Sequence, residues 1–254
     1  MENLIAIAKE AGKIILDAHC ENKDIETKSG DADFVTKYDK YVQDFLKSEI
    51  TELYPEASFM GEENNEDGFK SAGTLIVVDP IDGTQNFIKN LHHSCVVIGI
   101  MKDCMPYKSV VYDPYYDEVF YAERSKGAYL NGKRIFVSDC GLGNAVIGFG
   151  SVPYYAELYD KTFNLLRALM PECADIRRSG SAALDLCYIA CGRFDLFFEY
   201  RLSLWDYCAA SLIITEAGGV IEGANREKLK FNGQSAIIAG NPKAYADFNE
   251  KFVF

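Results

Sequence analysis

The chain has 254 residues, enough to bury a sizeable core as one large domain or as two closely packed halves. Apolar residues make up 48% of it and charged residues 25%, and no run of 18 apolar residues occurs, so we expect no membrane span. The net charge of −12 argues against nucleic acid as a general partner. An anionic substrate is still compatible with that charge, since bound divalent cations can reverse the potential of a site.

The sequence also favours a cytoplasmic protein. Met1-Glu2-Asn3-Leu4 lacks a basic segment followed by an apolar stretch, so we expect no secretory signal. The eight cysteines form no C-x-x-C pair and lie mostly in apolar segments. This pattern favours reduced thiols in the core over disulfides or zinc ligands.

Two amphipathic helices are predicted in the first part of the chain. Apolar residues at helical spacing indicate one helix from residue 4 to about 20 and a second from about 37 to 53. The polar residues 21–33 between them are expected to form an exposed loop. A short strand is expected before Gly61-Glu62-Glu63.

From residue 75 to 137 the pattern changes to short strands separated by turn signals. The predicted strands are 75–78, 95–101, 109–112, 118–122 and 134–137. Helices and strands then alternate, with strands at 145–149, 194–198, 220–222 and 236–239 and helices at 156–169, 181–191, 205–217 and the C-terminus. A composition shift near Gly141-Leu142-Gly143 predicts two closely packed halves, 1–140 and 141–254, that form one functional unit.

Asp79-Pro80-Ile81-Asp82-Gly83-Thr84 follows the apolar run 75–78, so we expect it where a buried strand ends. Pro, Asp and Gly are common turn formers, and an ordinary turn is one interpretation. The other is a functional site, because side chains at the end of a rigid element can be directed into a cleft.

Three further acidic residues, Asp39, Glu62 and Asp206, also lie at the ends of predicted elements. Each has a structural alternative. Glu62 begins an acidic run that could be a solvated loop, whereas Asp39 and Asp206 could close capping boxes with Thr36 and Ser203. If the acids meet in one cleft, they repel one another, and a hard divalent cation such as Mg²⁺ relieves that repulsion.

Taken together, these motifs resemble those of the inositol monophosphatase family, within the larger superfamily of lithium-sensitive, Mg²⁺-dependent phosphatases. Gly61-Glu62-Glu63 is similar to the family's GEE motif, residues 79–87 to DPIDGTxNF, and residues 205–219 to WDxAAxxLIxxEAGG. Residues 33–39 match DxVTxxD, and residues 180–183 match a helix start in the second half. The resemblance extends over essentially the whole chain and implies an α+β fold, the layered αβαβα sandwich of that family.

The resemblance implies a metal centre with two or three Mg²⁺ ions. Its ligands would be the side chains of Glu62, Asp79, Asp82 and Asp206 and the backbone carbonyl of Ile81. Asp79 would bridge two of the ions.

Further roles follow from the same resemblance. Thr84, hydrogen-bonded to Asp39, would orient or deprotonate the attacking water together with Glu62. The backbone amides of Gly83 and Thr84, with the ions, would hold the phosphate, as suits phosphoryl transfer. Lys28 either corresponds to a family lysine near a mobile metal-binding loop or is one more solvated lysine.

The resemblance also implies a substrate pocket. Glu199 corresponds to a carboxylate that hydrogen-bonds inositol hydroxyls, and Ser151, Ser181, Ala182 and Asp206 to other positions beside the substrate. A carboxylate at residue 199 suits a neutral polyol better than a second phosphate, because anions would repel. The structural alternative is a glutamate at a strand end, in solvent.

Two arginines leave the substrate open. Arg177 and Arg178 precede Gly180-Ser181 at an expected helix N-terminus, where anions bind readily. They could bind a second phosphate, as in a sugar bisphosphatase, although such arginines in this family are more often structural or lie at the subunit interface.

We therefore expect a Mg²⁺-dependent phosphomonoesterase that hydrolyses myo-inositol monophosphate to myo-inositol and phosphate through a metal-activated water. The alternative substrates are fructose 1,6-bisphosphate, another sugar phosphate, histidinol phosphate or a 3′-phosphonucleotide. A regulatory binding protein on the same fold is a third hypothesis. The resemblance also implies a homodimer and inhibition by lithium.

Overall fold

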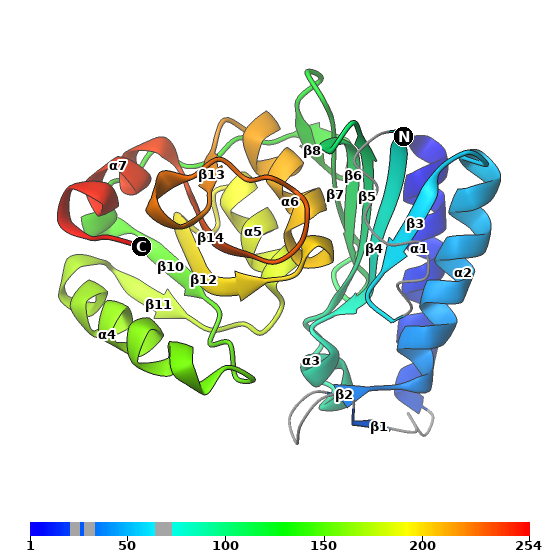
Figure 1. Cartoon of the computed structure of the whole chain (residues 1–254), viewed down its shortest axis with the longest axis horizontal. Coiled ribbons are helices and arrows are strands. Elements are labelled where there is room, and N and C mark those ends of the chain that lie inside the picture. Colours follow the sequence, from blue (N-terminus) through cyan, green and yellow to red (C-terminus); the bar gives the residue numbers. More distant parts are fainter. Residues whose placement is uncertain (21–25, 28–33, 64–72) are drawn as a thin grey trace.

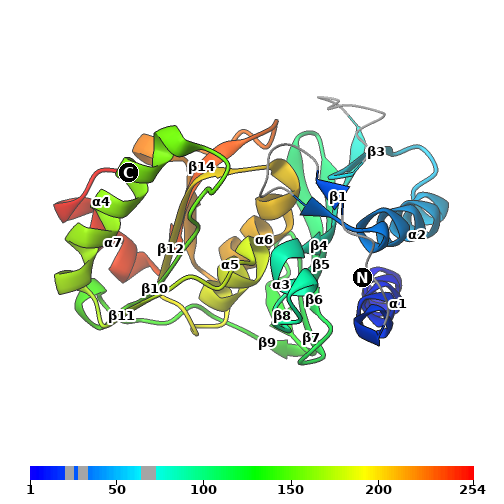
Figure 2. The same cartoon turned by 90° about the horizontal axis from the view of Figure 1, so that it is seen from below.

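Alternating layers of helices and sheets run through the molecule from the N-terminal helices to the C-terminal helix (Figure 1). The computed structural model describes residues 1–20, 26–27, 34–63 and 73–254. In order, the layers are α1 with α2, a seven-stranded sheet, α5 with α6, a five-stranded sheet, and α4 with α7 (Figure 2). This arrangement confirms the predicted αβαβα sandwich.

The first layer consists of α1 (Glu2–Asp17) and α2 (Lys37–Leu53). The bounds of α2 agree with the prediction, and a 3₁₀ turn (Ala18–Cys20) follows α1. Apolar side chains three, four and seven residues apart give each helix one buried face, which packs against the outer face of the seven-stranded sheet.

The seven-stranded sheet has the spatial order β3-β4-β5-β6-β7-β8-β9. Its strands are β3 (Ser58–Gly61), β4 (Thr74–Asp82), β5 (Cys95–Lys102), β6 (Met105–Asp113), β7 (Glu118–Glu123), β8 (Ala128–Leu130) and β9 (Lys133–Arg134). Only β3 and β4 pair in parallel. The sequence missed β8, and the strand predicted at 134–137 ends at Arg134, beyond which the Val137 N–H donates to the Ala217 carbonyl oxygen and not to a neighbouring strand.

The five-stranded sheet has the order β11-β10-β12-β14-β13. Its strands are β10 (Val146–Phe149), β11 (Asp175–Arg177), β12 (Leu196–Leu202), β13 (Val220–Glu222) and β14 (Ser235–Gly240). The helices α4 (Tyr159–Leu169) and α7 (Pro242–Lys251) cover its outer face. The predicted division into residues 1–140 and 141–254 falls between the two sheets and stays a prediction.

Between the sheets lie α5 (Ala182–Ala190) and α6 (Leu204–Glu216), which pack against each other. Both helices are apolar over most of their surface, as expected of helices covered on two sides. Two smaller elements complete the fold: the strand pair β1 (Glu26–Thr27) and β2 (Phe34–Val35), and the short helix α3 (Thr84–Ile88) that follows β4. No helix among the described residues combines the length and apolar character needed to span a bilayer.

A buried carboxyl group closes the end of β6. Asp113 Oδ1 accepts hydrogen bonds from the backbone N–H groups of Tyr115 and Tyr116 at 2.9 and 3.3 Å. Asp113 Oδ2 is buried and has no hydrogen-bond partner among the described residues. Burial raises the pKa of Asp113 to about 6, against the effect of the two backbone hydrogen bonds. Ionising this side chain therefore costs more free energy in the folded state than in the unfolded chain.

Replacing Asp113 by Asn should make the stability less dependent on pH. Because its folded pKa lies above the unfolded value, the carboxyl group lowers stability as the pH rises from about 4 through 6. At about pH 7.5 we expect Asp113→Asn to be more stable than wild type by about 2 kcal/mol, and the two proteins to be alike near pH 4. Urea unfolding at both pH values measures this, and a variant less stable than wild type at pH 7.5 would show the prediction to be wrong.

Candidate functional site

The motif that begins at Asp79 lies at the end of a strand, as predicted, but the strand extends to Asp82 and not only over the predicted residues 75–78. β4 continues to Asp82, and its pairing with β5 shifts by one residue between Asp79↔Val97 and Asp82↔Cys95. In a regular strand, residues three apart point to opposite faces. The extra residue of this bulge turns Asp82 to the side of Asp79, while Ile81 packs among the core residues under α1 and α2.

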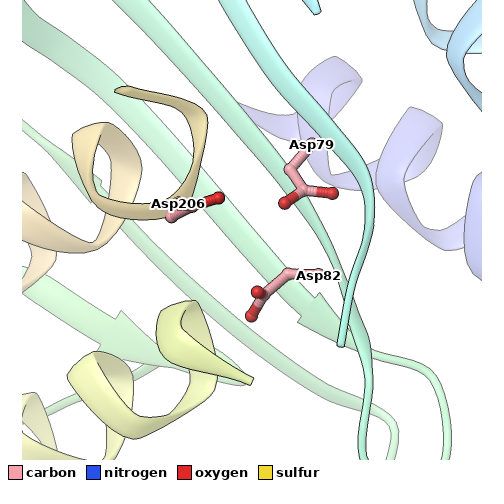
Figure 3. Close-up of side chains that lie close together, drawn as sticks. All are labelled: Asp79, Asp82 and Asp206. Atoms are coloured by element: carbon pink, nitrogen blue, oxygen red, sulfur yellow. The ribbon is translucent and has the colours of Figure 1, made fainter. Parts of the chain in front are cut away.

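Three carboxylates meet beside this bulge. Asp79 and Asp82 extend from β4 and Asp206 from the first turn of α6, and the three side chains point toward one another (Figure 3). One carboxylate oxygen of each lies within 4.8 Å of the others. Because α6 lies in the layer between the sheets, it brings Asp206 beside two acids of β4, which lie 124 and 127 residues earlier in the sequence.

Each of three acids also contacts the N-terminus of a different helix. Asp39 closes a capping box with Thr36 at α2, and Asp206 closes one with Ser203 at α6. Asp82 Oδ2 accepts hydrogen bonds from Ser181 Oγ and, at 2.9 Å, from the Ala183 N–H in the first turn of α5. The structural alternative for Asp39 and Asp206 is therefore correct, and it coexists with their place beside the bulge.

Ionising the clustered acids at the same time costs free energy. Burial raises the pKa of Asp82 to about 6, and the hydrogen bonds from Ser181 and Ala183 oppose that rise. Burial, followed by the charges of Asp82 and Glu62, raises the pKa of Asp206 well above its usual range. Ionising these groups therefore places negative charge in a buried environment, and a divalent cation with oxygen ligands would offset that cost.

Thr84 links the bulge to the buried Asp39. Its Oγ1 lies 3.3 Å from Asp39 Oδ1 and 3.1 Å from the Ile81 carbonyl oxygen. Asp39 is fully buried, and its other oxygen accepts the N–H and the hydroxyl of Thr36. The predicted Thr84–Asp39 pair is therefore present, with Thr84 between Asp39 and the cavity.

A cavity of about 380 Å³ opens over the cluster. Of the predicted site residues, Glu62, Asp79, Ile81, Asp82, Gly83, Thr84, Arg178, Ser181, Ala182, Glu199 and Asp206 line it. Among the described residues, Asp39, Ser151 and Arg177 do not, although both neighbours of Ser151 do. Lys28 lies outside the described residues.

The side chain of Glu199, on β12, lines this cavity and lies against Gly150. A Cβ at residue 150 would overlap the Glu199 carboxyl group, so only Gly150 leaves room for it. Val152, a buried β-branched residue with φ +44°, donates its backbone N–H to the same carboxyl group. Burial nevertheless raises the pKa of Glu199 to about 8, and the charge of Arg178 opposes that rise. A strained backbone beside a binding cavity is typical of functional sites.

The structure separates the two arginines. The helix start expected at Gly180-Ser181 is present, since Ser181 is the N-cap of α5, and both arginines precede it. Arg177 ends the edge strand β11 and forms an exposed ion pair with Asp175 at 2.6 Å. Of these two arginines, only Arg178 lines the cavity.

The sequence missed several cavity residues. Asp185 lines it from α5, and burial raises the pKa of this carboxyl group to about 8. Arg201 stacks on the ring of Tyr155 at 3.9 Å and donates a hydrogen bond to Gln234. The helical spacing Ser181–Asp185, one turn apart, was a usable signal for Asp185, whereas the residues around Tyr155 carry no motif.

Three comparisons relate the chain to known proteins. The model of the inositol monophosphatase family matches residues 1–253. The Nus factor SuhB of Salmonella typhimurium is 38% identical over 245 residues, covering 94% of this chain and 90% of the relative. The crystal structure of the extragenic suppressor protein suhB from Bartonella henselae has a TM-score of 0.92 at 32% identity, covering 98% of this chain and 96% of that one. The structure of the Staphylococcus aureus IMPase-II with inositol monophosphate bound has a TM-score of 0.82 at 29% identity, covering 98% and 91%.

We expect a divalent cation to stabilise the fold through the three clustered aspartates. Saturating Mg²⁺ should raise the Tm of the wild-type protein by several degrees, since a ligand that binds only the folded state stabilises it. Asp206→Asn keeps the shape of the helix cap but removes one charge, so most of the Mg²⁺-dependent rise should disappear. Asp44→Asn, at an exposed position of α2, is the matched control and should respond like wild type. Equal Mg²⁺ responses in all three proteins, measured by thermal unfolding, would contradict this.

Proposed function

The chain belongs to the inositol monophosphatase family, and on that premise we propose that it hydrolyses myo-inositol monophosphate to myo-inositol and phosphate with Mg²⁺. The observation that carries the proposal is the cluster of Asp79, Asp82 and Asp206 within a cavity that Glu199 also lines. Family membership supports a phosphatase that acts on phosphorylated substrates. The size of the cavity supports a small substrate.

The residues of the cluster fit a magnesium centre. Asp79, Asp82 and Asp206, with Glu62 and the Ile81 carbonyl, would hold two or three ions, since Mg²⁺ prefers carboxylate and carbonyl oxygens. When bound, Mg²⁺ supplies positive charge against the phosphate oxygens and makes a bound water more acidic. The raised pKa values of Asp82 and Asp206 are compatible with this assignment, because burial and, to a smaller extent, neighbouring acids make both carboxylates costly to ionise without a cation.

Thr84 orients the attacking water in this proposal. Its hydroxyl hydrogen is directed to Asp39 or to the Ile81 carbonyl, so its oxygen can accept a hydrogen bond from water in the cavity. Asp39 acts only through Thr84, since Asp39 is fully buried. Glu62 lines the same cavity and takes the proton that the water gives up.

The turn into α3 holds the phosphate. Gly83 has φ +90°, a left-handed conformation that side chains rarely adopt, and a Cβ there would lie 3.0 Å from the His93 carbonyl oxygen. Glycine therefore lets the chain turn sharply beneath the cavity. The backbone N–H groups of Gly83 and Thr84 then serve as donors to the phosphate oxygens.

Glu199 recognises the substrate's hydroxyl groups. A carboxyl group with a pKa of about 8 is largely protonated at neutral pH, so it can both donate a hydrogen bond to a hydroxyl and accept one. Ser181 and Ala182 line the cavity beside it, whereas the role of Ser151 rests on the family resemblance alone. Arg178 in the same cavity is the observation that favours a bisphosphate as the alternative substrate.

A regulatory role is the second candidate function, and one observation favours it. The bacterial relatives at 38% identity are named Nus factor SuhB, a name that specifies no enzyme activity. Such a role is compatible with catalysis. We further propose a homodimer, inhibition by lithium, no general binding of nucleic acid, and a cytoplasmic location, which the seven free described cysteines support.

Asp79→Asn should abolish phosphate release while leaving the protein folded. Asn can still accept the 3.0 Å hydrogen bond from the Ile81 N–H that Asp79 Oδ1 accepts, so the bulge keeps its shape. The lost charge should lower kcat by about 1,000-fold or more, given the size of electrostatic effects at phosphoryl transfer sites. Phosphate release and circular dichroism measure both properties, and full activity in the folded variant would sink the metal assignment.

A substrate panel with Mg²⁺, with and without Li⁺, tests the choice of substrate. We expect the highest kcat/KM for myo-inositol monophosphate and inhibition by Li⁺. Glu199→Leu should lower that kcat/KM by about 10-fold, because a hydroxyl loses its partner. The same variant should leave hydrolysis of p-nitrophenyl phosphate, which has no polyol, unchanged. A preference for fructose 1,6-bisphosphate that Arg178→Ala removes would establish the alternative.

A further inference from the structure

Helix α2 carries a buried amide one turn after Asp39. Gln43 is 1% exposed and lies four residues after Asp39, so both side chains extend from the same face of the helix. Asp39 contacts Thr84, as described above. Gln43 contacts a different part of the site, the segment Gly61-Glu62-Glu63 that follows β3.

The Gln43 carboxamide lies directly against the backbone of that segment. A Cβ at residue 61 would be 2.5 Å from Gln43 Cδ and would overlap Oε1, so the amide occupies the space that a side chain would need. The backbone N–H of Glu63 donates a hydrogen bond to Gln43 Oε1 at 2.8 Å. Gln43 thus contacts the residues on both sides of Glu62.

We propose that Gln43 is a positioning residue that fixes the direction of Glu62 toward the three aspartates. This inference rests on the proposed function, in which Glu62 binds metal and accepts a proton. With Gly61 packed against the amide and the Glu63 N–H bound to it, the backbone is held on both sides of Glu62. The side chain of Glu62 lines the same cavity as the three aspartates.

The chemistry of an amide suits this place. Gln43 Oε1 accepts a backbone hydrogen bond as a carboxylate would, but it adds no negative charge next to acids that already repel one another. The amide is also rigidly held. Its helix begins at the Thr36–Asp39 capping box and packs through Val42, Leu46 and Ile50 on the seven-stranded sheet. Helix α2 therefore positions two residues of the site. It holds Thr84 through Asp39 and the backbone beside Glu62 through Gln43.

Gln43→Met tests the proposal, because Met fills a similar volume without the acceptor. The Mg²⁺ concentration at the midpoint of the thermal shift, measured without substrate, should rise by about 10-fold, as is typical when support for a ligand is lost. The kcat for myo-inositol monophosphate at saturating Mg²⁺ should fall while KM stays near its wild-type value. Ile50→Val, a core change two turns along the same helix, is the control for destabilisation and should leave the Mg²⁺ midpoint unchanged.

Gly61→Ala disrupts the same contact from the side of Gly61. It is the test to use if Gln43→Met does not fold. Its Cβ displaces the amide, so the Mg²⁺ midpoint should rise as in Gln43→Met. Wild-type midpoints in the folded variants would overturn the role of Gln43 and leave the proposed function intact. A wild-type protein that Mg²⁺ does not stabilise would instead overturn the metal centre, and the role of Gln43 with it.

Discussion

Mutual repulsion among buried carboxylates is the constraint on which the candidate site depends. Asp79, Asp82 and Asp206 come within 4.8 Å of one another, and burial raises the pKa of at least two of them. The fold offsets part of this cost with helix N-termini. Asp82 contacts α5 and Asp206 contacts α6, where the partial positive charge of the first turn favours an anion. A divalent cation bound in the cavity would neutralise the negative charge that the helix N-termini leave unbalanced.

The bulge in β4 and the middle helical layer bring these acids together. In a regular strand the second carboxylate, three residues after the first, would point under α1 and α2, where Ile81 lies instead. Asp206 reaches the same point only because α6 lies between the two sheets (Figure 1). The site is therefore assembled across layers, and the relative position of the layers determines its geometry.

Much of the fold and the acid cluster could be predicted from the sequence. Helical periodicity predicts the bounds of α2, and the acidic motifs predict Asp79, Asp82 and Asp206 as a cluster. The bulge could not be predicted, because the turn-forming residues of the motif also fit a strand end. The contacts of Gln43 and the glycine beneath Glu199 depend on packing between distant elements, which leaves no local pattern in the sequence.

The capping boxes bear on how family members are compared. Asp206 holds a helix terminus, so a relative that lost catalysis would still be under selection to keep a hydrogen-bond acceptor there for folding. Asp79 accepts the Ile81 N–H in the same way. Because Asn can accept both hydrogen bonds without the charge, an exchange of Asp for Asn at position 79 or 206 is the change that a relative with no need for a cation could make while keeping the fold.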